Sequence, residues 1–198
     1  MRKKILLVAG HESRSVLNKF PLVGAVLKKI GYLYTWEQRE VMHIVAKAYI
    51  ELKELGYDVK VCPFQYNLGK KIKWANKIGT INDVLISVHL NSNPNPAVTG
   101  SEVWFYSGND WSEKTAKKLA EIVSETIGLR NRGEKGDKAN DHKRLGIIRD
   151  TEPAAFLLEL GFMSNPEDLW LIRKTDNYGL KGGVNAVINC VKYLSNEK

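Results

Sequence analysis

The stretch PAAFLLELGFMSNPED, residues 153–168, joins an apolar run to the start of a helix and says most about the fold. Residues 154–160 are apolar except for Glu159, as in a strand whose two faces are both covered. The Asn-Pro-Glu sequence at 165–167 then provides an N-cap, a first-turn proline and an acidic residue, which together predict a helix. A buried strand that leads into a helix is typical of α/β proteins.

The same alternation runs through the rest of the chain. Further short apolar runs predict strands at residues 5–9, 59–63, 84–90, 102–106 and 146–149. Apolar residues at helical spacing predict helices over residues 37–55, ending before Gly56, and through residues 116–127, with a short extra helix in residues 21–30. We therefore expect one α/β domain over residues 1–198, with a central, mostly parallel, twisted sheet of about six strands flanked by helices.

Composition excludes several protein classes. The 198 residues are 43% hydrophobic and 26% charged, as in ordinary soluble domains, and contain no apolar run of the roughly 18 residues that span a membrane. The apolar run after Lys4 is shorter than the core of a signal peptide, which has about 7 to 15 residues. Cys62 and Cys190 lie far apart and form no CxxC pair, so we expect reduced thiols in a chain made in a cytoplasm.

The positive charge of the chain suggests nucleic-acid binding as an alternative function. The chain has 30 Lys and Arg against 22 Asp and Glu, a net charge of +8, and half of this excess lies in residues 130–149, with seven basic and three acidic residues. Such a segment fits a basic nucleic-acid-binding module. The segment contains only His142 as a residue that stacks on bases, and no RRM, KH or helix-turn-helix signature, so we expect no nucleic acid partner.

Three polar residues lie where strands of the predicted sheet end. His11 follows the first apolar run, His89 lies near the end of residues 84–90, and Glu159 interrupts the run at 154–160. Ligands of α/β sheets bind at the carboxyl ends of the strands. Taken singly, a strand histidine is more often a satisfied core residue. Taken together, two histidines and one carboxylate are the three protein ligands of an open catalytic zinc site.

The identity of the carboxylate ligand stays open on these grounds. Glu37 opens a predicted helix, where an acidic residue is also explained by the helix dipole alone, and Glu12 adjoins His11. If one of these two residues binds the metal, Glu159 is a second carboxylate at the site that is not a ligand. It is then free to take a proton from water and return it to a leaving nitrogen. Two further histidines compete as ligands: His43 is predicted to point away from the apolar stripe of its helix, and His142 to lie in a solvated loop.

These residues resemble the zinc-dependent N-acetylmuramoyl-L-alanine amidases. The motifs that carry the resemblance are residues 9–11 (AGH), Glu37, residues 87–91 (SVHLN) and residues 153–168, with weaker echoes at 73–76, 100–103 and 132–133. The resemblance implies that His11, Glu37 and His89 bind one zinc ion and that Glu159 is the catalytic acid-base. It also implies cleavage of the amide that joins N-acetylmuramic acid to L-alanine in peptidoglycan, with Asn91 and Arg132 as candidate substrate contacts. Asn91 is explained equally well as a polar turn residue.

The resemblance also sets expectations about context. The lack of a signal peptide is typical of the phage endolysins in this family, which are made in the host cytoplasm and released by a holin. The alternative is an exported bacterial autolysin of which this sequence is the excised catalytic domain. In both cases we expect residues 1–198 to be a catalytic domain without a separate carboxy-terminal wall-binding domain. The basic charge suggests an anionic Gram-positive wall with teichoic acids as partner. Residues 12–14 (ESR) depart from the glycines that many members have after the first histidine. The chief enzyme alternative is another zinc amide hydrolase, such as a carboxypeptidase-like wall peptidase.

Overall fold

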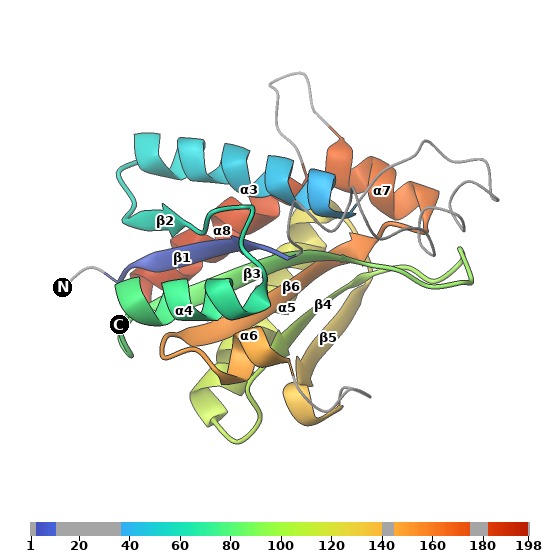
Figure 1. Ribbon diagram of the computed structural model, residues 1–198. Helices are drawn as coiled ribbons and strands as arrows, with labels where there is room; N and C mark the ends of the chain where they lie inside the picture. Colours follow the sequence, from blue (N-terminus) through green and yellow to red (C-terminus); the bar gives the residue numbers. More distant parts are fainter. Residues whose placement is uncertain (1–2, 11–36, 140–144, 175–181, 198) are drawn as a thin grey trace.

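A six-stranded sheet forms the centre of the computed structural model, which describes residues 3–10, 37–139, 145–174 and 182–197 (Figure 1). Its strands are β1 (Ile5–Ala9), β2 (Val59–Val61), β3 (Val84–Asn91), β4 (Ser101–Phe105), β5 (Asn131–Gly136) and β6 (Ala154–Phe162), in the order β2-β1-β3-β6-β4-β5. The first four strands in this order are parallel, while β4 is antiparallel to β6 and parallel to β5. The expected α/β domain with a mostly parallel sheet is confirmed.

Helices cover both faces of this sheet (Figure 1). On one face lie α3 (Glu37–Glu54), α5 (Asp110–Ile127) and α8 (Gly182–Asn196), with α7 (Pro166–Arg173) packed against α8 and β6. On the other face lie α4 (Leu68–Ile78) and α6 (Gly146–Arg149), while a short 3-10 turn covers Asp137–Ala139. Each face of the sheet packs against its helices in a hydrophobic core. Because side chains alternate along a strand, Ile86 lies in the core beside α3, α5 and α8, and Leu85 lies in the core beside α4 and α6. None of the described helices is long and apolar enough to cross a membrane.

Helix α3 follows the predicted apolar pattern closely. The buried residues of the predicted stripe are Val41, Ile44, Val45, Ala48 and Leu52. The helix ends at Glu54 and Gly56 has a φ of +79°, a left-handed conformation that glycine adopts without strain and that ends helices. Leu55, which the pattern also assigned to the stripe, lies past the helix end and is 57% exposed.

The predicted strand at residues 146–149 is wrong, because these residues form helix α6. A run of four residues is too short to show whether its period is that of a helix or a strand. Ile147 and Ile148 are both buried in the core beside α4, whereas neighbouring residues of a strand point to opposite faces. The extra helix predicted in residues 21–30 lies outside the described part of the chain.

Strand β5 has no counterpart among the predicted strands. Its sequence, NRGEKG, contains no apolar side chain, so the pattern of apolar runs predicts no strand there. The strand pairs only with β4 at the edge of the sheet, and its side chains are partly or fully exposed. Charged residues are common on edge strands, where they discourage pairing with other chains, so apolar periodicity could not reveal this one.

The start of α7 anchors the end of β6. Asn165 caps the helix as predicted, because its side chain accepts hydrogen bonds from the backbone of residues 167 and 168. The fully buried Asp168 accepts hydrogen bonds from Phe162 N at 2.8 Å and from Gly100 N at 3.1 Å, and its other oxygen bonds the Thr99 hydroxyl. One carboxylate thus ties the end of β6, the strand that carries Glu159, to the chain that enters its neighbour β4.

Candidate functional site

A row of polar side chains crosses the sheet through three neighbouring strands. His89 of β3 pairs in register with Glu159 of β6, and Glu159 pairs with Glu102 of β4. Residues paired in register project from the same face of a sheet. Leu85 and Leu157, from the core beside α4 and α6, share this face with the row. The pairing therefore brings His89 and Glu159 together, as the sequence predicted for a common site.

Glu37 reaches the same place from helix α3. Its Oε1 lies 3.1 Å from His89 Nδ1 and accepts a hydrogen bond from Leu90 N at 3.3 Å, although 52 residues separate Glu37 from His89. The other ring nitrogen, His89 Nε2, lies 3.2 Å from Ser87 Oγ. Because Glu37 is the first residue of α3, the helix start delivers its carboxylate to the end of β3.

Gly10 allows the His89 ring to lie against the end of β1. The Gly10 N–H donates to Val88 O at 2.9 Å, which continues the pairing of β1 with β3 by one residue. A Cβ added to Gly10 would lie 2.4 Å from His89 Cε1 and Nδ1, far inside contact distance. The next residue, His11, lies outside the described residues, as do Glu12 and His142, so their predicted roles stay predictions.

Glu159 is a partly buried residue with one shielded carboxylate oxygen. Its Oε2 is shielded from solvent and has no hydrogen-bond partner among the residues that the structure describes. Burial raises the pKa of Glu159 well above its usual value, and the nearby carboxylates of Glu37 and Glu102 raise it further, while Lys135 opposes them. A carboxyl group with a raised pKa accepts a proton more readily than an ordinary one, which is a property of a general acid-base.

Glu102 is the centre of a buried hydrogen-bond network that the sequence reading did not assign. It is only 2% exposed; its Oε2 accepts from Arg132 Nε at 2.7 Å and from Lys135 Nζ at 2.6 Å. Burial would raise the pKa of Glu102, but the hydrogen bonds from these two cations outweigh it and the pKa is lowered. The available signal was the acidic residue before the apolar residues VWF of this strand, which resembles the acidic residue within the apolar run at Glu159.

Both candidate substrate contacts lie beside this network. Arg132 lies over the Phe162 ring, 5.1 Å from its centroid, as well as bonding Glu102. Asn91 donates to Glu102 Oε1 at 3.3 Å, and its own side-chain oxygen accepts from Ser92 N at 2.8 Å, as in a polar turn. Asn91 lies on β3, next to the strand that carries Glu159, and Arg132 lies on β5, two strands away from it. Contact of either residue with a substrate stays a prediction.

The donors at the site suit a zinc ion, although the residues described include no group of three His, Cys, Asp or Glu side chains placed to hold a metal. Imidazole nitrogen and carboxylate oxygen are common zinc ligands, and two ligand atoms of one tetrahedral zinc lie about 3.3 Å apart for bonds of about 2.0 to 2.1 Å. The separation of 3.1 Å between His89 Nδ1 and Glu37 Oε1 is close to this value. His43, the competing ligand, is exposed on α3, which confirms that it faces away from the apolar stripe.

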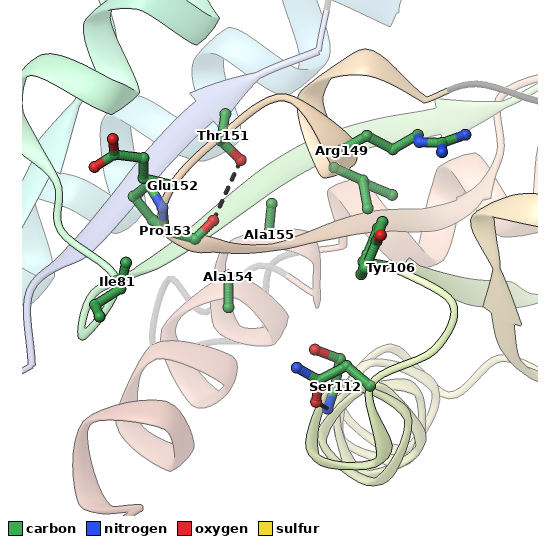
Figure 2. A pocket seen from close by; sticks show the side chains of 11 residues that line it. Ile81, Tyr106, Ser112, Arg149, Thr151, Glu152, Pro153, Ala154 and Ala155 are labelled. Atoms are coloured by element: carbon green, nitrogen blue, oxygen red, sulfur yellow. Dashed lines mark hydrogen bonds between the residues drawn. The ribbon is translucent and has the colours of Figure 1, made fainter.

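A separate cavity lies at the other end of β6 (Figure 2). Its volume is about 280 Å³, and Ala154 and Ala155 form part of its wall together with Tyr106 and Arg149. Glu159 lies four positions after Ala155 along the strand, a distance of roughly 13 Å at the usual rise per residue. The cavity is therefore distinct from the polar row, and neither His89 nor Glu159 lines it.

The chain is similar to proteins that act on cell walls. The family model described as N-acetylmuramoyl-L-alanine amidase matches residues 5–189. The probable cell wall amidase LytH of Staphylococcus saprophyticus is 33% identical over 86 residues, which are 43% of this chain and 27% of that protein. The germination-specific N-acetylmuramoyl-L-alanine amidase of Bacillus subtilis is 26% identical over 92 residues, which are 46% of this chain and 37% of that protein. The matches span well under two thirds of either relative.

Solved structures share the fold. The catalytic domain of the CD27L endolysin targeting Clostridia difficile superposes with a TM-score of 0.68 and 24% sequence identity, and the match covers 96% of this chain and 97% of that domain. At this level of identity the likeness concerns the arrangement of strands and helices. That arrangement is the one that places Glu37, His89 and Glu159 together.

Proposed function

Because the chain belongs to the N-acetylmuramoyl-L-alanine amidase family, we propose that it hydrolyses the amide bond between N-acetylmuramic acid and L-alanine in peptidoglycan. The observation that carries the proposal is the convergence of Glu37, His89 and Glu159 from three separate elements on one end of the sheet. These are three of the four residues that the sequence assigned to the reaction, and the fourth, His11, follows directly after Gly10 in the chain.

The proposed metal ligands are His11, Glu37 and His89, for one zinc ion per chain. The donor types and the 3.1 Å separation between Glu37 Oε1 and His89 Nδ1 support two of them. A zinc ion bound in an open site of this kind acts as a Lewis acid, which polarises a carbonyl oxygen and lowers the pKa of water. Ser87 Oγ, at 3.2 Å from His89 Nε2, helps to set the orientation of the ring.

Glu159 is the proposed proton carrier. The attacking water loses a proton to the Glu159 carboxylate as its oxygen bonds to the lactyl carbonyl carbon. Glu159 then gives this proton to the nitrogen of L-alanine as the carbon–nitrogen bond breaks, which leaves a carboxylate on the sugar and a free amino group on the peptide. The shielded Oε2, without a partner among the described residues, supports this role because no structural bond occupies it.

Metal analysis combined with a wall-lysis assay tests this proposal. Purified protein should contain about one zinc per chain, as a three-ligand catalytic site holds one ion. Chelation should abolish lysis of purified wall, and added zinc should restore it. Full activity in a chelated, zinc-free protein would contradict the proposed metal dependence.

We also propose that the basic charge steers the protein to an anionic wall, such as a Gram-positive wall with teichoic acids. Lys138 is exposed, but Lys135 bonds the buried Glu102 and Arg149 lies 3.4 Å from Asp137, so part of the basic segment is already paired. Reversing the charge of Lys138 and Lys143 should weaken wall association at low salt and leave it unchanged at high salt. Equal binding at both salt concentrations would contradict steering, and tight, salt-sensitive binding to RNA or DNA would favour the nucleic-acid-binding alternative.

The proposed biological role is that of an endolysin. The likeness to the CD27L endolysin domain supports it, and the named relatives LytH and the germination-specific amidase support a bacterial wall enzyme instead. Expression of the chain in a host with a matching wall decides between them. An endolysin should lyse the cells only when a holin is expressed with it, whereas lysis or wall turnover without a holin would contradict that role.

A further inference from the structure

We infer that Lys71 is a positioning residue for the proposed zinc site, because its ammonium group holds the end of β1 and Gly10, against which the His89 ring lies. The inference rests on the proposed function, in which His89 is a metal ligand. Lys71 itself lies on helix α4, outside the proposed ligand set.

The first observation is the burial and bonding of Lys71. The residue is only 3% exposed, and its Nζ donates to Ala9 O at 2.6 Å and to Gly10 O at 2.8 Å. Removing an ammonium group from water costs several kcal/mol unless other groups solvate it. Lys71 lies one turn before the buried Ala75, at a position of α4 where an apolar residue would pack without this cost. A lysine there indicates that its hydrogen bonds are used.

The second observation is the fit around Gly10. Its N–H is bonded to Val88 O and its carbonyl oxygen to Lys71, while the His89 ring occupies the space that a Cβ would need. These two hydrogen bonds fix the main chain at Gly10, and the position of Gly10 limits where the His89 ring can lie. Lys71 and His89 therefore hold the same glycine from two sides, and His89 is itself a proposed ligand.

The consequence is a link between α4 and the geometry of the metal site. Groups that orient metal ligands without touching the metal change metal affinity by about 10- to 100-fold when they are removed. Lys71 acts on the backbone of Ala9 and Gly10, against which the His89 ring lies, rather than on the ring itself. Loss of its ammonium group should therefore weaken zinc binding while the six-stranded sheet stays intact.

The test compares Lys71→Met, Lys71→Arg and Lys73→Met in the full chain. Lys73 lies on the same helix but is exposed, so Lys73→Met controls for the loss of a positive charge. Zinc affinity is measured by competition with a chelator, and thermal unfolding is followed separately on the metal-free proteins. Lys71→Met should bind zinc roughly 10- to 100-fold more weakly than the wild type. Lys71→Arg should recover most of the affinity, because a guanidinium also donates to carbonyl oxygens, and Lys73→Met should match the wild type.

A spectroscopic readout separates positioning from stability. The visible absorption bands of Co²⁺ bound in place of zinc report the arrangement of its ligands, and they should change in Lys71→Met but not in Lys73→Met. Wild-type zinc affinity and wild-type cobalt bands in folded Lys71→Met would overturn the inference. If Lys71→Met does not fold, Lys71→Gln, which lacks the charge and the reach, replaces it with the same expected loss. A wild-type protein that binds no zinc would instead overturn the proposed function, and this inference with it.

Discussion

Glu102 and Glu159 face each other across the antiparallel β4–β6 pair, yet their carboxyl groups have pKa values shifted in opposite directions. Arg132 and Lys135 bond the Glu102 carboxylate and keep it charged, whereas Glu159 is partly buried near other carboxylates and its pKa is raised. Neighbouring acids whose surroundings separate their pKa values take different roles in a site. The contrast supports the proposal that Glu159 exchanges a proton while Glu102 stays an anion.

Replacing Glu159 with glutamine should remove hydrolysis and leave metal binding intact. The amide has nearly the same shape but cannot carry the proton between water and the leaving nitrogen. Loss of a general acid-base lowers turnover by about 10²- to 10⁴-fold. Glu159→Gln is compared with Glu152→Gln, an exposed residue just before the same strand, in assays of kcat and zinc content. Near wild-type turnover in Glu159→Gln would show that the proton carrier is another group.

Replacing His89 with alanine should abolish both zinc binding and activity. The imidazole lies 3.1 Å from the Glu37 carboxylate, and its removal takes away one of the three proposed ligands. The matched control is His43→Ala, since His43 is exposed on α3, the helix that begins with Glu37. Metal content of the purified variants is the measurement. A His89→Ala protein with a full equivalent of tightly bound zinc would exclude His89 as a ligand.

Gly10→Ala should displace the His89 ring and reduce activity at least tenfold. The added methyl carbon would lie 2.4 Å from ring atoms, so either the ring or the end of β1 must move. Overpacking of this kind costs roughly 1 to 3 kcal/mol of stability. Gly69→Ala in α4 is the control, because its added Cβ finds its nearest neighbour at 3.8 Å and alanine favours the helix. Equal kcat/KM values for Gly10→Ala and the wild type would show that the site tolerates a shifted ring.

Glu102→Gln should destabilise the protein at neutral pH more than in acid. The variant leaves the side chains of Arg132 and Lys135 without their shared anion, at a cost of roughly 1 to 3 kcal/mol. Because the pKa of folded Glu102 is below its usual 4.5, the carboxylate stabilises the fold above that pH and loses this effect as the pH falls through the folded value. Urea unfolding at pH 7 and pH 3 measures the difference, which should shrink at pH 3. A difference of the same size at both values would place the effect in packing rather than in charge.

Much of the fold was predictable because its strands are buried on both faces. The strands at β1, β3 and β6 were predicted within two residues of their ends, since their apolar runs have sharp limits. Strand β5 was missed because an edge strand needs no apolar side chains, and Gly146–Arg149 was assigned to the wrong element because four residues show no period. The spacing of apolar residues shows which side chains are buried. It therefore predicts a helix or strand only where that element is stabilised by burying apolar side chains.

The candidate site was predictable in its chemistry but not in its surroundings. A carboxylate in an apolar strand and a histidine at a strand end stand out against their neighbours, and His89 and Glu159 indeed pair in register. The helix start at Glu37 gave no such signal by itself, and its contact with His89 depends on how α3 crosses the sheet. Lys71 donates to the carbonyl oxygens of Ala9 and Gly10, and no pattern of side chains reveals hydrogen bonds to the backbone.

The products formed from purified peptidoglycan test the central claim most directly. Amidase activity should release one new L-alanine amino terminus for each bond cut, without new reducing sugar ends, and mass spectrometry should find sugar chains that carry free lactyl carboxylates. Glu159→Gln, run in parallel, should give none of these products. Release of free terminal amino acids from the stem peptide, with the bond to the sugar intact, would contradict the claim and identify a carboxypeptidase-like enzyme.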